Sequence, residues 1–329
     1  MKKPTFVLRG AIFLSLFLIV HFSPDSVELR GQGTVTDDLS PISGVKGSRR
    51  NEVIFGRKHG VALTMDIFTP ENANGLGCVM ALSGGWVSHR GRINHPLLGG
   101  LIEGFLKRGY TVFSVVHGSQ PKYTIPEILE DMHRAVRFVR YHAEDYGVDP
   151  DRLGITGGSA GCHLALMQGI AGEPGDPESK DPVERVSSRV QAVACYNPPT
   201  DFLNYGEPGE IALGRGILKN YRAPFDFQEF DRQSRSNVPV TDVARILEIG
   251  RAISPIYHVS PDDPPTLLVH GDADRLVPIQ QSIGMVEKLQ EVGVEARLEI
   301  KEGGGHGWPN ITEQIPLLVD WCDTHLGAE

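Results

Sequence analysis

Gly157-Gly158-Ser159-Ala160-Gly161 is the stretch of this sequence that decides the fold. It matches the pattern Gly-x-Ser-x-Gly, with a strand-like run before it (152–156) and a helix-like run after it (162–167). A serine at the apex of a sharp strand-to-helix turn is held in a strained backbone conformation that exposes its hydroxyl. The flanking glycines leave room where a Cβ would collide with the neighbouring strand or helix. The stretch therefore predicts that Ser159 is a nucleophile that attacks a carbonyl carbon, as in serine hydrolases.

The rest of the chain alternates short apolar runs with helical periods, which predicts an α/β fold. An antiparallel hairpin is expected first, at 52–55 and 61–68, because apolar residues alternate there on either side of a turn. The later strands are continuous apolar runs, as in a mostly parallel sheet covered by helices on both faces. Strands are expected at 78–82, 110–116, 152–156, 190–196, 266–270 and 296–300, with helices near 96–107, 126–143, 278–292 and 311–325.

The N-terminus has the layout of an export signal. Lys2, Lys3 and Arg9 precede the apolar run 11–20. That run is well short of the ~20 apolar residues that span a bilayer. No Ala-x-Ala cleavage site follows. Residues 1–23 are therefore expected to be a cleaved signal peptide or an uncleaved anchor of an exported, periplasmic or extracellular protein.

The remaining chain divides into a linker and one catalytic domain. Residues 24–50 are polar, with Gly, Ser and Pro, and are expected to form a disordered linker. Residues 51–329 are expected to be one domain. Within it, 200–256 breaks the strand–helix alternation and is rich in aromatic and charged residues, which suggests an inserted lid over the carboxyl edge of the sheet. The alternative is a structural excursion without substrate contact.

Charge, motifs and cysteine content bear on which partners, metal sites and disulfides the protein is expected to have. The formal net charge is −9, which argues against nucleic acid or an anionic membrane surface as a partner. Any membrane contact is expected only through the N-terminal anchor. There is no Cys-x-x-Cys and no His-Glu-x-x-His, so a metal site built from protein side chains has no support in the sequence. Export would permit disulfides, but the apolar settings favour buried free thiols. The four cysteines are Cys78, Cys162, Cys195 and Cys322.

A serine hydroxyl is a poor nucleophile at neutral pH and needs a base. His306 is expected to be that base, since it lies in a glycine-rich loop between the last strand and the last helix. His163, in the helix after Ser159, is expected to be a packed helix histidine. His270 ends a strand and is expected to be a structural hydrogen-bonding group. His117, at another strand end, is kept as a candidate pocket residue.

The base needs an orienting acid, and two carboxylates follow the strand at 266–270. Asp272 and Asp274 are both candidates to accept a hydrogen bond from the imidazole and stabilise the imidazolium. Asp272 is closer to the strand and could serve only to cap the turn.

The oxyanion needs hydrogen-bond donors. In Gly-x-Ser-x-Gly enzymes one donor is the residue after the serine, here Ala160, and another comes from an early loop. The early loop here is Ser83-Gly84-Gly85-Trp86, where glycines let backbone N–H groups approach a substrate. Gly84, Gly85 and Trp86 are the candidate oxyanion-hole residues of this loop, with Gly85 and Trp86 as the favoured donors.

Four segments, Ser83-Gly84-Gly85-Trp86, 157–161, 270–278 and Gly305-His306-Gly307, match a known family. With them, residues 50–326 resemble the α/β-hydrolase superfamily. The branch they resemble is the exported serine esterases with acetylxylan- or feruloyl-esterase-like domains, which are related to prolyl oligopeptidase catalytic domains. The resemblance implies an α/β-hydrolase fold with an inserted lid, and the chain order nucleophile, acid, base. It also implies that Asp274 is the acid. Ser83 departs from the hormone-sensitive-lipase branch, which has His at that place in His-Gly-Gly-Gly.

The resulting hypothesis is a secreted serine carboxylesterase with Ser159, Asp274 and His306 as its triad. It would cleave small acyl esters of acetyl or feruloyl type, on small molecules or carbohydrate, through an acyl-enzyme and without a cofactor. One alternative is a serine peptidase of the prolyl-oligopeptidase type, although such enzymes generally carry a β-propeller before the catalytic domain. Another is an inactive binding module on the same fold. The complete triad favours the esterase.

Overall fold

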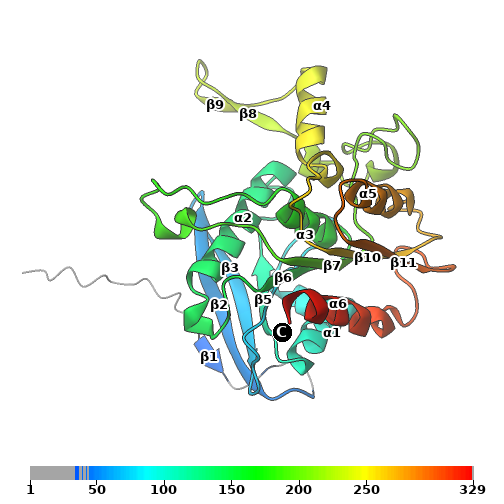
Figure 1. Cartoon of the computed structure of the whole chain (residues 1–329). Helices are drawn as coiled ribbons and strands as arrows, with labels where there is room; N and C mark the ends of the chain where they lie inside the picture. Colours follow the sequence, from blue (N-terminus) through cyan, green and yellow to red (C-terminus); the bar gives the residue numbers. More distant parts are fainter. Residues whose placement is uncertain (1–33, 37–38, 40–41, 43, 328–329) are drawn as a thin grey trace, which may run out of the picture. The chain divides into compact units, whose positions relative to one another are not determined.

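A computed structural model of the chain describes residues 34–36, 39, 42 and 44–327. The expected signal segment 1–23 lies outside the described residues. Among the described residues, nine strands form one sheet in the order β1-β2-β3-β5-β4-β6-β7-β10-β11 (Figure 1). Their bounds are β1 (Thr34–Thr36), β2 (Gly47–Lys58), β3 (Val61–Pro70), β4 (Gly77–Ala81), β5 (Thr111–Val116), β6 (Leu153–Thr156), β7 (Ala192–Tyr196), β10 (Thr266–Gly271) and β11 (Ala296–Lys301).

The sheet is antiparallel at one edge and parallel elsewhere. β3 pairs antiparallel with both β2 and β5, and β2 pairs antiparallel with β1. Every pair from β5 to β11 is parallel. The predicted opening hairpin is the β2–β3 pair, and each predicted apolar run falls on one of the parallel strands. The prediction of a mostly parallel sheet is confirmed.

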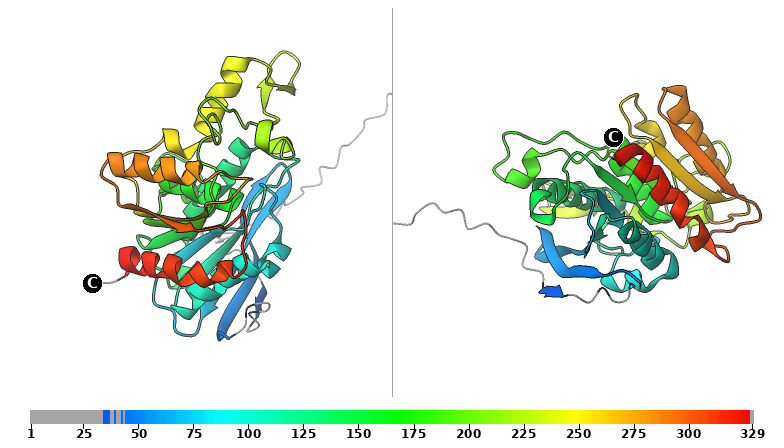
Figure 2. Two further views of the ribbon diagram at one scale, coloured as in Figure 1. Left: turned by 90° about the vertical axis from the view of Figure 1, so that its right-hand side faces the viewer. Right: turned by 60° about the horizontal axis from the view of Figure 1, so that its bottom comes forward.

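Helices cover both faces of the sheet, as Figures 1 and 2 show. Alternate residues of one strand enter separate cores: Val79 and Ala81 of β4 pack on one face, and Cys78 and Met80 on the other. This two-sided burial explains why the parallel strands are continuously apolar. One core lies against α2 (Ile125–Tyr141), α3 (Ala160–Ile170) and α5 (Gln280–Glu291), and the other against α1 (Pro96–Lys107) and α6 (Ile315–Leu326).

The insertion at 200–256 has a packed part and a projecting part. Phe202, Tyr205 and Phe225 are buried in the core that includes α3. The hairpin of β8 (Gln228–Asp231) and β9 (Ser236–Pro239) stands away from the sheet with α4 (Val243–Ala252), in yellow in Figure 1. Phe230 in this hairpin is 63% exposed. The insertion therefore contributes to the core through its aromatic residues and exposes the hairpin to solvent.

The predicted disordered linker is wrong for part of its length. β1 lies within 24–50 and pairs with β2, which itself begins at Gly47. Leu39 and Ile42 are buried, with exposures of 4% and 8%. This order could not be predicted from the sequence, because an edge strand is held by backbone hydrogen bonds and two isolated apolar residues show no periodic pattern.

No helix within the described part of the chain is long and apolar enough to cross a bilayer.

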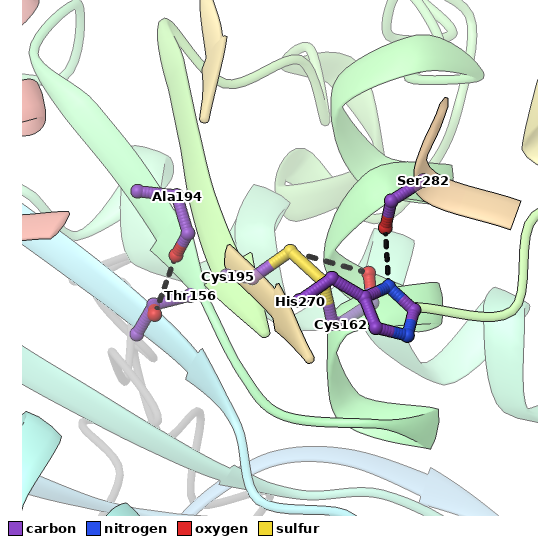
Figure 3. The surroundings of a disulfide bond; sticks show 6 residues. All are labelled: Thr156, Cys162, Ala194, Cys195, His270 and Ser282. Carbon is purple, nitrogen blue, oxygen red and sulfur yellow. Dashed lines mark hydrogen bonds between the residues drawn. A yellow bond between two sulfur atoms is a disulfide. The ribbon is translucent and has the colours of Figure 1, made fainter. Parts of the chain in front are cut away.

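The expectation of four free thiols is also wrong. Cys162 of α3 and Cys195 of β7 form a disulfide across 33 residues of sequence (Figure 3). Cys78 and Cys322 are free and buried, as predicted. The pairing depends on α3 packing against β7, which places two buried cysteines in reach of each other, and no local pattern reports that contact.

Candidate active site

Ser159 lies at a sharp turn between β6 and α3. Its φ is 54° and its ψ is −121°, a strained conformation for a residue with a side chain. The turn is tight on both sides. A Cβ at Gly157 would come within 2.6 Å of the Gly161 backbone, and one at Gly161 within 2.6 Å of the Ala81 carbonyl. The two glycines let the turn pack against α3 and β4, which holds Ser159 at the end of β6.

The structure brings Ser159, His306 and Asp274 together from segments far apart in sequence. His306 Nε2 lies 2.8 Å from Ser159 Oγ, and His306 Nδ1 lies 2.7 Å from Asp274 Oδ2. An ionised carboxylate can only accept, so Nδ1 carries the hydrogen and Nε2 is left to accept from the serine hydroxyl. This is the arrangement in which a histidine can remove the serine proton.

Asp274 is held as an anion. Its side chain is fully buried, and its Oδ1 accepts hydrogen bonds from the N–H groups of Leu276 and Val277 at 2.8 and 2.9 Å. Burial alone would raise the pKa of Asp274, but hydrogen bonds from His270 and His306 hold that pKa well below its ordinary value. A carboxylate that stays charged can stabilise the imidazolium of His306.

The second candidate acid, Asp272, does not contact His306. It is exposed, and its Oδ1 accepts a hydrogen bond of 2.6 Å from the Gly303 N–H. It therefore ties the turn after β10 to the turn after β11. His270 is buried as expected of a structural group, with Nδ1 2.7 Å from Ser282 Oγ and Nε2 2.9 Å from the Val277 carbonyl.

The loop after β4 is a two-residue turn. Gly84 and Val87 exchange two backbone hydrogen bonds of 3.1 Å, and Gly85 and Trp86 between them have φ of 56° and 59°. The N–H of Gly84 is thus used inside the turn, so Gly84 belongs to this loop without offering a free donor. Within the described residues, the N–H groups of Gly85, Trp86 and Ala160 donate no hydrogen bond. These three remain available to an oxyanion.

Trp86 holds a positive φ because its side chain is anchored. The side chain is buried, and its indole Nε1 donates a 3.2 Å hydrogen bond to His163 Nδ1. The rings of Phe202 and Phe225 pack on it with centroids at 5.9 and 5.4 Å. His163 in turn donates from Nε2 to the Ile253 carbonyl at 2.7 Å, and burial lowers the pKa of His163 to about 4, so it is neutral. The predicted packed histidine thus supports the loop at 83–86, which we call the oxyanion loop for its predicted role.

Ser159 and His306 line a pocket of about 390 Å³. Tyr221, from the insertion, forms part of its wall: a Cβ on Gly85 would come within 2.7 Å of the Tyr221 ring. The insertion therefore forms part of the pocket wall. His117 is buried and does not line this pocket, so its selection as a pocket residue was wrong.

Three polar residues of the pocket were missed by sequence reasoning. Arg92 and His95 reach the pocket from the segment after the oxyanion loop. Asn197, at the end of β7, lines it too and donates from Nδ2 to the His306 carbonyl at 3.0 Å. Of these three residues, only Asn197 could have been suggested as a pocket residue by the sequence, because it directly follows a strand. Across the described residues, no group of three His, Cys, Asp or Glu side chains is placed to hold a metal ion.

Comparison with known proteins found relatives in both sequence and structure. The probable carboxylic ester hydrolase LipM of Mycobacterium tuberculosis is 30% identical over 247 residues, which cover 73% of this chain and 52% of the relative. The chain spans about half the length of the curated relatives it matches.

Two solved structures share the fold. A truncated carbohydrate esterase from gut microbiota has a TM-score of 0.68 at 22% identity, covering 85% of this chain and 96% of that one. The acetyl ester-xyloside bifunctional hydrolase from Caldicellulosiruptor lactoaceticus has a TM-score of 0.66 at 23% identity, covering 83% and 96%. At these identities the likeness shows the fold, which is that of the α/β-hydrolases. The family model BD-FAE matches residues 65–289, more than half of the chain, and the protein accordingly belongs to the BD-FAE family.

Proposed function

We propose that this protein is a serine carboxylesterase that cleaves small acyl esters, of acetyl or feruloyl type and including esters on carbohydrate, through an acyl-enzyme. The observation that carries the proposal is the hydrogen-bonded chain from Ser159 through His306 to Asp274, at the wall of a pocket. The pocket volume of about 390 Å³ suits a small ligand. The names of the relatives, a carboxylic ester hydrolase and a carbohydrate esterase, support the same chemistry.

The proposed reaction has two halves. Ser159 Oγ attacks the ester carbonyl while His306 Nε2 takes its proton, and Asp274 stabilises the imidazolium. The oxyanion accepts hydrogen bonds from the N–H of Ala160 and from that of Gly85 or Trp86, and one such donor is worth ~10²–10³ in rate. His306 then protonates the leaving alcohol. Water, activated by the same histidine, hydrolyses the acyl-enzyme and releases the acid.

Two features outside the triad belong to the proposal. The segment 200–256 acts as a wall of the substrate pocket, supported by the position of Tyr221. The protein is exported, and the signal-like segment 1–23 supports this. The disulfide between Cys162 and Cys195 gives further support, because disulfides persist in oxidising compartments.

The test compares the parent protein with Ser159→Ala on p-nitrophenyl acetate. Loss of the nucleophile should lower kcat by up to ~10⁶, with an unchanged melting temperature as the control for folding. An inactive parent, or equal activity in both proteins, would contradict the proposal. Acetylated and feruloylated sugars are then run beside a proline-containing peptide. Faster cleavage of the peptide would assign the triad to a peptidase instead.

A further inference from the structure

Arg92 lies in the wall of the active-site pocket and is a cation with no partner among the residues that the structure describes. It lies in the short helix η1 (Arg90–Asn94), which follows the oxyanion loop. Its Nε atom is buried without an acceptor, and its side chain forms no hydrogen bond or ion pair with any residue that the structure describes. Arg92 as a whole is partly buried. Taking the Nε–H of a guanidinium out of water without an acceptor is unfavourable, so the arrangement needs a reason.

The other arginines show how unusual this is. Exposed arginines need no partner, because water solvates them. Among the described arginines that are partly or fully buried, each except Arg92 contacts a carboxylate, a carbonyl or an aromatic ring. These are Arg49 and Arg90 on Asp66, Arg50 on the Tyr146 ring, Arg134 and Arg137 on Glu184, Arg140 on the Arg189 carbonyl, and Arg152 on the Leu326 carbonyl.

The guanidinium of Arg92 lies directly against the oxyanion loop. A Cβ on Gly84 would collide with its Nη2 atom, so glycine is required there to admit the arginine. Gly84 precedes Gly85, one of the residues whose N–H is free to bind an oxyanion. The positive charge therefore stands beside the position of the reacting carbonyl.

No acid neutralises this charge from inside the pocket. The described residues that line it include no Asp or Glu. Asp274 lies behind His306, where its oxygens already accept from His306, Leu276 and Val277. His95, which also lines the pocket, has its pKa lowered by burial and by the charge of Arg92. The pocket thus presents an unpaired cation to whatever occupies it.

We propose that Arg92 binds a carboxylate of the substrate, so that the preferred esters carry a carboxylate close to the scissile acyl group. The inference rests on the proposed esterase function and narrows its substrate class. A guanidinium matches a carboxylate through two parallel N–H donors, and such charge-assisted bonds are stronger than neutral ones. The carboxylate can belong to the acyl part, as in a monoester of a dicarboxylic acid, or to the alcohol part, as in an acetylated uronic acid.

The test uses two matched pairs of esters. p-Nitrophenyl acetate is compared with p-nitrophenyl hemisuccinate for the acyl side. Methyl O-acetylglucoside is compared with methyl O-acetylglucuronide for the alcohol side. We expect the parent to prefer the charged member of at least one pair. Arg92→Gln should lower kcat/KM for that member by roughly 10- to 100-fold, and for its neutral partner by less than about 3-fold.

The matched control is Arg57→Gln, which removes an exposed arginine of β2 away from the pocket and should leave all four values unchanged. Since Arg92 has no partner among the described residues, Arg92→Gln should leave the melting temperature unchanged or raise it. If Arg92→Gln does not fold, Arg92→Lys takes its place. That variant keeps the charge and should retain a weakened preference for the charged ester.

Two kinetic results would overturn the inference while leaving the esterase proposal intact. One is a parent without preference for either charged ester. The other is an equal loss on charged and neutral esters in Arg92→Gln, which would make Arg92 a general or structural group.

If the parent hydrolyses none of the four esters, the esterase proposal fails and binding decides the inference. Succinate and methyl glucuronide are then titrated calorimetrically into Ser159→Ala, with and without Arg92→Gln. Binding that Arg92→Gln abolishes upholds the carboxylate site, and absence of binding by both ligands overturns it.

Discussion

The indole nitrogen of Trp86 donates a hydrogen bond of 3.2 Å to Nδ1 of His163. Trp86 belongs to the turn after β4, and His163 lies one helical turn beyond Ser159 in α3. The contact therefore joins the two segments that hold the free N–H groups near the nucleophile, at Gly85–Trp86 on one side and Ala160 on the other. Both partners are buried, so the distance between these segments is set by a packed contact instead of by flexible loops.

His163→Phe should weaken this connection. The substitution keeps a ring of similar size, but it leaves the Trp86 N–H and the Ile253 carbonyl buried without partners. We expect the free energy of unfolding to fall by ~1–3 kcal/mol in urea denaturation. The kcat on p-nitrophenyl acetate should fall ~10-fold or more, because the oxyanion donors move. As a control, His133→Phe removes a contact with Ser188 far along α2 and should not change kcat. Unchanged kcat in His163→Phe would rule out this role.

Asp274→Asn and Asp272→Asn form a matched pair. In Asp274→Asn the new side-chain amide cannot act as a fixed acceptor for His306 Nδ1–H, which favours the wrong imidazole tautomer. The kcat should then fall by up to ~10⁴, as in other serine hydrolases. In Asp272→Asn the amide oxygen can still accept from the Gly303 N–H, so kcat should stay within a few-fold. Steady-state kinetics on one ester distinguishes the two. A larger loss in Asp272→Asn would reassign the acid.

Two buried histidines should make the fold sensitive to acid. Burial lowers the pKa of His117 and of His163 to about 4, whereas an unfolded histidine titrates near ~6.5. Between these values the unfolded chain binds more protons than the native one, so the free energy of unfolding falls as the pH falls. From pH ~7.5 to ~5 the loss should be about 2 kcal/mol per histidine. Urea denaturation at the two pH values measures this decrease in the free energy of unfolding. In His163→Phe the decrease should be smaller by the contribution of one histidine. An identical pH dependence in that variant would contradict the assignment.

The disulfide predicts how many thiols react with a thiol reagent before and after reduction. In denaturant without reductant, two thiols should react with a thiol reagent, and four after reduction. Cys322→Ala should lower each number by one. The double variant Cys162→Ala/Cys195→Ala should lose roughly 3–4 kcal/mol of stability, since the bond closes a loop of 33 residues. Four reactive thiols before reduction would show that the bond is absent.

The two parts of the insertion should differ in their effect on activity. Replacing residues 229–238 by two glycines removes the exposed hairpin, none of which lines the pocket. The kcat/KM on p-nitrophenyl acetate should then change by less than ~3-fold. Tyr221→Ala removes a ring from the pocket wall beside Gly85 and should raise KM by ~10-fold. If removal of the hairpin abolished activity, the hairpin would have to close over the site.

The parallel strands of the fold and two residues of the candidate triad, Ser159 and His306, could be predicted from local sequence patterns. The parallel strands can be predicted because burial on both faces makes each of them a continuous apolar run. Ser159 is readable because its turn needs glycines within a few residues on either side, and His306 because glycines surround it. These apolar runs and flanking glycines lie close together along the chain, so they can be recognised in a single sequence.

The sequence by itself determined the α/β class, the nucleophile turn and the candidate base. The residues alone leave Asp272 and Asp274 both open, and the family resemblance favours Asp274. Only the tertiary structure shows which of them contacts His306, and only it joins Cys162 to Cys195. It also showed that Gly84 is a glycine because Arg92 packs on it, and that Arg92 has no partner among the described residues. These results depend on the strand order, which places side by side segments that are distant along the chain. A contact between distant segments leaves no spacing or period in either of them, so it can be seen only after the sheet has assembled.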